Sequence, residues 1–375
     1  MSRDFTTWQP QAIPLSKIGE VVSAHPEIST VDETEHNLEE LFLLRNPQFK
    51  FNENYKEELK TFSEKYQDKN FGNWFYFPWT NTLIRYFPED LHNELRTGRN
   101  KYLITSDEQN QFYYSTIAFL GMSVGSHIAL TVAMTGGSRH IKLADPDILS
   151  GDNLNRVRLG FQHVGVSKSV LVARQIYEIN PYATIELYPD GITENNFEGL
   201  LKGVDLLVEE TDNPYWKLRV RELAREREIP VIMGTDNGDG AIIDIERFDM
   251  NKTLPLLNGL IGKLTAGELR TMKPSDLPKV AGKIAGANLV VPRMLQSVLE
   301  VGKSLYSWPQ LGTAATMCGS LGAYLARRII LRDKKIKSGR YSVNPDTTFE
   351  CRYRLGFLSR KLTFLKFIGV MSTRK

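Results

Sequence analysis

Cysteine is scarce in this sequence, and that scarcity excludes two kinds of stabilisation. Only Cys318 and Cys351 occur among 375 residues. Two distant cysteines cannot build the disulfide framework of a small secreted domain. No pair of C-x-x-C motifs is present, so a structural zinc ion held by four thiolates is excluded and no zinc is expected.

Long apolar runs are also missing. The sequence opens with MSRDFTTWQPQ, which lacks the apolar core of a signal peptide, and the cytoplasm is therefore the expected compartment. The longest weakly polar run, 311–326, is rich in Gly, Ala and Thr and is too short to cross a bilayer comfortably. We expect a buried helix there and no membrane span.

Neither sign of charge dominates the chain. It carries 47 basic and 44 acidic residues, a formal net charge of +3. A balance this small gives no reason to expect nucleic acid as a partner. With 41% hydrophobic and 24% charged residues, the composition is that of a globular protein with a large core, organised as one large domain and a smaller one.

A β-α-β pattern runs from Thr116 to Asp145. An apolar strand ends at a turn containing Gly121, Ser123 and Gly125, a helical pattern follows, and a second apolar strand ends in Asp145. Small residues let a backbone approach phosphate at a helix N-terminus, and the terminal carboxylate can bind a ribose hydroxyl. The turn departs from G-x-G-x-x-G because serine replaces the second glycine. Alone, it predicts a dinucleotide site.

Strands and helices alternate beyond this unit. The expected elements are a helix over 167–179, a strand over 184–188, a short helix over 194–200, a strand over 205–209, a helix over 216–227 and a strand over 231–234. Such alternation is typical of an α/β, doubly wound, mostly parallel Rossmann-like sheet with ligands at the carboxyl ends of its strands. Residues 241–249 suit an edge or antiparallel strand, and 251–291 suit a long crossover loop over the site.

The two ends of the chain differ from this centre. Residues 1–90 predict a small α+β accessory module, whose aromatic stretch 71–87 suits a core or an interface between modules, or alternatively a substrate-docking surface. Residues 91–350 form the main domain. They include two late helices, the second with small residues suited to a core or a dimer seam. The tail, 351–375, has seven Lys or Arg and no acid; we expect it to pack on its own domain with basic residues outward, the alternatives being a membrane surface or a partner.

Charged side chains follow the ends of the expected strands. The acids are Asp145, Asp147 and Asp212, and the cations are Arg156 and Lys168. Cations neutralise a triphosphate, and Mg²⁺ prefers one or two carboxylates together with phosphate oxygens. A hydride-transferring dehydrogenase needs no such set. Each residue alone also has a structural explanation, such as a helix cap at the Asp-Asn-Pro sequence 212–214.

Six motifs in order carry a resemblance: G-x-S-x-G-S, LADPD, D-NLNR, VGVSK, EINP and ETDN. Together, over about residues 95–234, they resemble the ThiF/MoeB family of adenylating enzymes, relatives of the ubiquitin-activating enzymes. The resemblance implies that Asp145 binds the ribose, that Asn153 and Arg156 contact the triphosphate with Lys168 beside them, and that Asp212 is linked to Mg²⁺. The remaining nucleotide contacts would come from Gly121, Ser123, Gly125 and Asp147.

The resemblance also implies a homodimer. In the family an R-x-x-R motif ahead of the first strand sends an arginine into the partner subunit's site, and Arg96 to Arg99 fits this motif, with Arg99 the expected finger. The implied reaction is attack of a carboxylate on the α-phosphate of ATP, giving an acyl-adenylate and pyrophosphate. Electrostatic stabilisation by the cations and Mg²⁺ would be its main catalytic contribution.

Departures from the family narrow the expected function. No cysteine lies between Gly234 and Met317, Cys318 falls in an apolar helix where burial raises a thiol pKa, and no motif supports Cys351. We therefore expect transfer to a nucleophile without a cysteine relay. Relatives that modify peptides, such as the microcin-maturing enzymes, carry an N-terminal clamp, so the expected substrate is a peptide or small protein. An NAD-dependent oxidoreductase and a nucleotide-binding scaffold without turnover remain alternatives.

Overall fold

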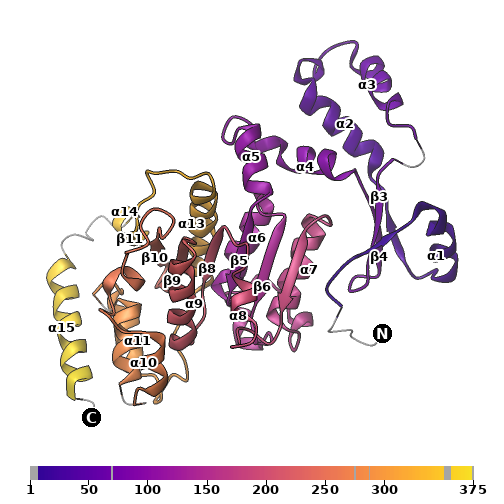
Figure 1. Cartoon of the computed structure of the whole chain (residues 1–375). Coiled ribbons are helices and arrows are strands. Elements are labelled where there is room, and N and C mark those ends of the chain that lie inside the picture. Colours follow the sequence, from indigo (N-terminus) through magenta and orange to yellow (C-terminus); the bar gives the residue numbers. More distant parts are fainter. Residues whose placement is uncertain (1–6, 69–70, 274–275, 287, 350–355, 374–375) are drawn as a thin grey trace.

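The protein was analysed as a computed structural model that describes residues 7–68, 71–273, 276–286, 288–349 and 356–373. Two separate sheets organise it, one near each end of the view in Figure 1. The smaller sheet has the strand order β1-β3-β4-β2. Its strands are β1 (Gln11–Ile13), β2 (Ser29–Val31), β3 (Asn73–Phe77) and β4 (Thr82–Tyr86), accompanied by α1 (Ile18–Ala24), α2 (Thr34–Arg45) and α3 (Tyr55–Glu64).

The aromatic stretch joins this small unit to the rest of the chain. Phe75 and Phe77 are buried and belong to the same apolar cluster as the main sheet. Trp79 donates a hydrogen bond to Glu178 (2.6 Å), near the end of α7 (Lys168–Ile179). The predicted role of residues 71–87 in a core between modules is therefore confirmed.

The main sheet has seven strands in the order β11-β10-β9-β8-β5-β6-β7. Neighbouring strands from β9 to β7 pair in parallel, whereas β10 pairs antiparallel with both β9 and β11. Their bounds are β5 (Thr116–Leu120), β6 (His140–Ala144), β7 (Thr184–Tyr188), β8 (Leu206–Glu209), β9 (Val231–Asn237), β10 (Gly240–Glu246) and β11 (Gly339–Val343). The predicted doubly wound α/β fold is confirmed, including the antiparallel strand over 241–249.

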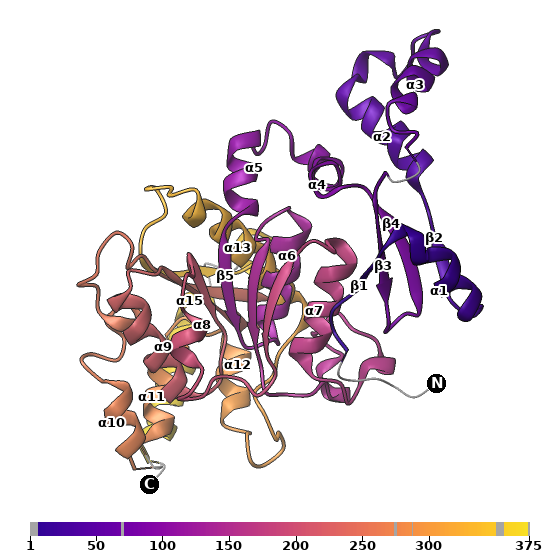
Figure 2. The same ribbon diagram turned by 45° about the vertical axis from the view of Figure 1, so that its right-hand side comes forward.

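Helices cover both faces of this sheet. One layer consists of α6 (Val124–Met134), α7 and α13 (Gly312–Ile330), and the other of α8 (Phe197–Leu200), α9 (Pro214–Glu226), α10 (Ala266–Thr271) and α11 (Leu277–Ala285). Figure 2 shows α7 and α9 on opposite sides of the strands. Ahead of the first parallel strand lie α4 (Glu89–Thr97) and α5 (Ser106–Tyr113).

The segment 251–291 is not the irregular loop that the sequence predicted. It contains α10 and α11, and Leu269 and Ile284 pack into the apolar cluster that includes α9. A capping box between Thr265 and Glu268 starts α10. The short helical turns are stabilised by tertiary packing, which is why their sequence shows little periodicity.

The small residues of α13 serve the core. A Cβ atom on Gly319 would stand 2.6 Å from Cβ of His127, and one on Gly322 would stand 2.8 Å from atoms of Ile128. Glycine therefore lets α13 approach α6 closely. Of the two alternatives, the core and the dimer seam, the structure supports the core.

The described part of the tail packs on its own domain with basic residues outward, as predicted, but the prediction did not include its outward leucines. Helix α15 (Phe357–Thr373) packs against α12 (Pro292–Val298), and Phe367 is buried there. Lys361 and Lys366 face outward as predicted, but leucines do so as well. In the part of the chain that the structure describes, no helix is both long and apolar enough to span a membrane.

Candidate functional site

A large concavity lies at the carboxyl ends of β5, β6, β8 and β9. Its volume is ≈ 1080 Å³, enough for a nucleotide with a second substrate beside it. The predicted residues that line it are Gly121, Ser123, Asp145, Asp147, Asn153, Arg156, Lys168 and Asp212. Ala281, Ile284 and Ala285 of α11 line it too, so the crossover segment does border the site.

The glycine turn shapes the floor of this pocket. Gly121 has a φ of +88°, and a Cβ atom there would stand 2.5 Å from the carbonyl oxygen of Glu210. A side chain is therefore excluded by conformation and by space. Gly125 is buried in the first turn of α6 and does not line the pocket itself, and its nearest neighbour is the Glu210 side chain, 3.5 Å from a built Cβ.

Asp145 is buried at the end of β6 and oriented by backbone amides. Its carboxylate accepts hydrogen bonds from the amide of Asp147 (2.7 Å) and from the amide of Met122. Burial raises the pKa of Asp145, and the two amide donors act against that rise. The turn and the carboxylate are thus one rigid unit, suited to a ribose.

An ion pair positions the lysine. Nζ of Lys168, at the start of α7, lies 2.9 Å from Oδ2 of the exposed Asp147, although the lysine side chain itself is largely buried. The amide of Lys168 also donates to the carbonyl of Asp147 (2.9 Å). The pair fixes a cation at a helix N-terminus, where anionic phosphate is favoured.

Asn153 and Arg156 come from the short 3₁₀ turn after β6. Asn153 is buried, and its Oδ1 accepts from the amide of Ser150 (3.3 Å). The guanidinium of Arg156 donates to the carbonyl of Asp152 (3.0 Å) and, at 3.4 Å, to Oγ of Ser123. Within the described residues Arg156 makes no ion pair, so its charge is available to an anion.

The Asp-Asn-Pro sequence divides two roles between neighbours. Oδ1 of Asn213 accepts from the amides of Tyr215 (2.9 Å) and Trp216 (3.2 Å) and caps α9. Asp212 is exposed in the pocket and has no hydrogen bond or ion pair to any residue that the structure describes. Among those residues no group of three His, Cys, Asp or Glu could hold a metal ion. A Mg²⁺ ion here would rest on Asp212 and phosphate oxygens.

Two acids in the pocket were missed by the sequence reasoning. Glu210 accepts from the amide of Gly234 (2.5 Å), and Asp236 accepts from Nε2 of Gln310 (3.1 Å). Burial raises the pKa of Glu210 well above its usual range, with the amide of Gly234 acting against the rise. Burial also raises the pKa of Asp236 to about 6. Only the adjacency of Glu210 to the T-D-N motif could have pointed to it.

A buried charge network lies beside this floor. Arg221 is fully buried and bridges Glu209 and Glu246, with Nε 2.6 Å from Oε2 of Glu246. Nζ of Lys217, which lines the pocket, lies 3.0 Å from Glu209. Glu209 is fully buried, so Lys217 is held at a buried carboxylate, whereas the partner of Lys168, Asp147, is exposed. Arg156 and Lys168 are therefore the better placed cations for phosphate.

Cys318 is buried in α13, as predicted. Burial raises the pKa of its thiol far above the usual range, with Asp236 acting in the same direction. A thiol held protonated in this way is a poor nucleophile. Cys351 lies outside the described residues.

The two arginines of the R-x-x-R motif behave differently, and neither lines the pocket. The guanidinium of Arg96 donates to the carbonyl of Ala133 (2.8 Å) and lies over the ring of Tyr113. Arg99 is exposed near the C-terminal end of α6, about 16 Å along that helix from the phosphate turn. Within one chain, Arg99 is therefore not part of the site; its action in a second subunit stays a prediction.

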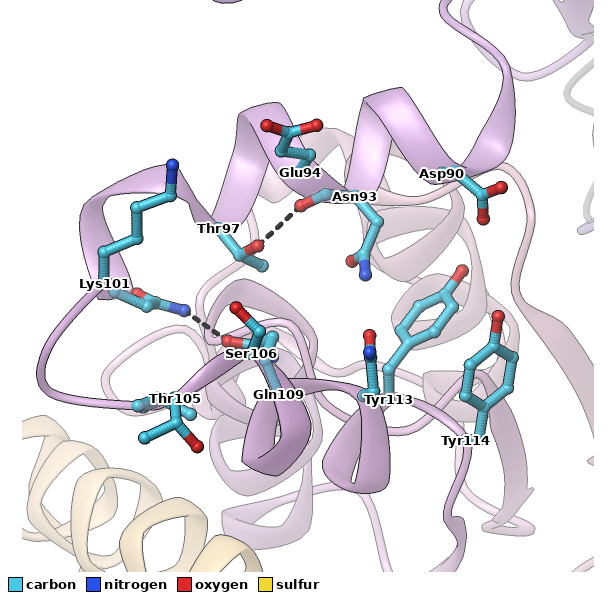
Figure 3. Close-up of a pocket in the computed structure, with 13 residues that line it drawn as sticks. Asp90, Asn93, Glu94, Thr97, Lys101, Thr105, Ser106, Gln109, Tyr113 and Tyr114 are labelled. Atoms are coloured by element: carbon cyan, nitrogen blue, oxygen red, sulfur yellow. Dashed lines mark hydrogen bonds between the residues drawn. The ribbon is translucent and has the colours of Figure 1, made fainter. Parts of the chain in front are cut away.

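A smaller pocket of ≈ 410 Å³ lies between α4 and α5 (Figure 3). Its walls are mainly amides, hydroxyls and the tyrosines Tyr113 and Tyr114, with Asp90 and Glu94 at one side. Its described lining has one cation, Lys101. This charge pattern does not suit a triphosphate, so the nucleotide belongs in the larger pocket.

Comparison with known proteins adds a family and several relatives. The model of the ThiF family matches residues 98–349. The uncharacterized protein MT1398 of Mycobacterium tuberculosis is 31% identical over 271 residues, covering 72% of this chain and 38% of that protein. The adenylyltransferase and sulfurtransferase UBA4 of Candida albicans is 31% identical over 87 residues, covering 23% of this chain and 20% of that protein. The chain thus spans well under half the length of these relatives.

Solved structures of similar shape were also found. The E. coli tRNA N6-threonylcarbamoyladenosine dehydratase TcdA superposes with a TM-score of 0.48 at 21% identity, covering 64% of this chain and 96% of that one. E. coli MccB superposes with a TM-score of 0.43 at 17% identity, covering 68% of each chain.

Proposed function

The chain belongs to the ThiF family, and we propose that it uses ATP to adenylate a carboxylate of a peptide or small protein. The observation that carries the proposal is the convergence of five side chains on one pocket. Asp145, Asn153, Arg156 and Lys168 come from the connection between β6 and α7, Asp212 comes from the connection between β8 and α9, and all five line the same cavity. They are the residues that the motifs identified as nucleotide contacts.

The chemistry follows from the charges of these groups. A carboxylate oxygen of the substrate attacks the α-phosphorus of ATP, a P–O bond forms, and the bond to the pyrophosphate oxygen breaks. Arg156 and Lys168 stabilise the charge that develops on the phosphate oxygens, while Asp145 holds the ribose. Bound beside Asp212, Mg²⁺ would neutralise phosphate charge and so favour departure of pyrophosphate.

The acyl group is transferred without an enzyme thioester in this proposal. The buried, protonated thiol of Cys318 supports that choice. The nucleophile is then either external or part of the substrate. ThiF-family membership favours ATP over NAD as the ligand, and the pairing of Lys168 with Asp147 has no evident role in hydride transfer.

Two further parts of the proposal concern assembly. Residues 1–90 would recruit the substrate, because their sheet is a separate unit fixed to α7 through the aromatic stretch. Arg99 would act in the site of a second copy, since it is exposed and distant from the pocket of its own chain. The protein would work in the cytoplasm as a homodimer.

The test has two steps. The full chain is first used to capture a binding peptide from a peptide library, and ATP–pyrophosphate exchange is then measured in the presence of that peptide. Asp212→Ala and Arg156→Ala are expected to abolish exchange, whereas Arg158→Ala, an exposed arginine two residues along and outside the pocket, keeps it. Exchange that survives both pocket substitutions would contradict the proposal. If the peptide is still captured after residues 1–90 are deleted, these residues do not recruit the substrate.

A further inference from the structure

Helix α15 presents an apolar stripe that points away from the protein. Residues at i, i+4 and i+7 share one face of a helix, so Leu358, Leu362 and Leu365 form one line along α15. Their exposed fractions are 70%, 59% and 55%. Figure 1 shows the helix at the outer edge of the molecule, at the end opposite the N-terminal unit.

The orientation of this stripe is fixed by packing on the other side of the helix. Phe367 is buried and Phe364 partly buried against a cluster that contains Ile242 of β10 and Met294 and Leu295 of α12. Phe364 and Phe367 lie about half a helical turn away from the leucine stripe. The leucines therefore cannot rotate into the core without breaking that contact.

Basic residues border the stripe. Lys361 and Lys366 are exposed and lie on either side of the leucines at 100° per residue. The segment 351–375 contains no acid anywhere in its sequence. Further exposed apolar side chains lie on the same helix, namely Phe357, Ile368 and Val370.

We propose that α15 docks the protein onto an anionic membrane surface. A helix with an outward leucine stripe and lysines along its margins inserts apolar side chains at the headgroup boundary while the lysines meet lipid phosphates. A second copy fits this face poorly. A symmetric contact would bring Lys361 and Lys366 of both copies to one interface, with no acid on the helix to pair with them. The proposal is independent of the adenylation chemistry.

Co-sedimentation of the full chain with vesicles tests this docking. Binding is expected to vesicles of phosphatidylcholine with about 30% phosphatidylglycerol, and it should weaken as salt rises. Replacing all three leucines (Leu358→Ser, Leu362→Ser, Leu365→Ser) is expected to reduce partitioning at least about tenfold. Lys361→Glu with Lys366→Glu should reduce binding to the anionic vesicles as well. Leu103→Ser, at an exposed leucine on a distant loop, should leave binding unchanged.

The substituted positions are exposed, so circular dichroism should show unchanged folding for each variant. No binding to anionic vesicles, or equal binding by the chain and its triple-serine variant, would overturn the proposal. A concentration-dependent dimer that the triple-serine variant abolishes, seen by analytical ultracentrifugation, would assign the face to a second copy and overturn it too. Vesicle binding that requires the leucines and the lysines together supports it.

Discussion

Two glycines in the same turn are expected to respond in opposite ways to the same substitution. At Gly121, alanine would adopt a φ of +88° and bring its Cβ within 2.5 Å of the Glu210 carbonyl oxygen. The conformation costs about 1–3 kcal/mol, and relieving the overlap requires the backbone to move by nearly 1 Å. Gly121→Ala should therefore destabilise the protein by at least about 3 kcal/mol.

Gly125 is the matched control. A Cβ there would meet Glu210 at 3.5 Å, an ordinary contact, and the residue lies in a helix with no positive φ. Alanine is favoured over glycine in a helix by about 0.5–1 kcal/mol, so Gly125→Ala should be as stable as the parent or slightly more.

Urea unfolding followed by circular dichroism compares the two variants under identical conditions. The expected result is a markedly lower midpoint for Gly121→Ala and an unchanged or higher midpoint for Gly125→Ala. Equal stability of the two variants would refute the account of the turn, because it would mean that the strand-to-helix geometry at Gly121 tolerates a side chain.

Three further predictions concern the buried groups around the pocket. Arg221→Met should destabilise the protein by about 3–5 kcal/mol in urea unfolding, because it leaves Glu209 and Glu246 buried without their partner, and only a small effect would show that the two acids are neutral. Asp236 has a pKa of about 6 in the folded state, above its ordinary value of 3.8, so the stability that its protonated form contributes is present below pH 3.8 and is lost as the pH rises through 6. The free energy of unfolding of the parent, relative to that of Asp236→Asn, should therefore fall between pH 3.8 and 6. A difference that does not change with pH would contradict the burial argument. Cys318→Ala should retain both adenylation and acyl transfer in a product assay. Loss of acyl transfer with adenylation intact would instead indicate that the Cys318 thiol carries the acyl group.

The sequence predicted the residues of the candidate site that belong to short motifs. Asp145 and Asp212 follow the ends of parallel strands, which meet at one edge of a sheet, and Lys168 begins the helix after β6. Their convergence could therefore be predicted from their order and spacing. The alternation of apolar and polar residues over 241–249 predicted an edge or antiparallel strand there, and β10 is antiparallel; the order of the strands in the sheet was not predicted. Asn213 could be identified as the cap because Pro214 begins the helix.

The positions of several side chains depend on tertiary packing and could not be predicted from the sequence. Glu210 is fixed by the amide of Gly234 in β9, and Asp236 by Gln310, contacts between residues far apart in the sequence. Glu210 opens the ETDN motif but was given no role there, and Asp236 belongs to no motif. Arg96 of α4 donates a hydrogen bond to the carbonyl of Ala133 in α6, a contact between distant segments that no local sequence pattern predicts. The outward leucines of α15 depend on which face of that helix meets α12.

Calorimetric titration of the full chain with MgATP tests the central claim most directly. ATP is predicted to bind with one site per chain, NAD is predicted not to bind, and Arg156→Ala or Lys168→Ala should each weaken ATP binding by about tenfold or more because each removes a phosphate cation from the pocket. Binding of NAD in preference to ATP, or ATP binding that neither substitution affects, would contradict the assignment of this pocket.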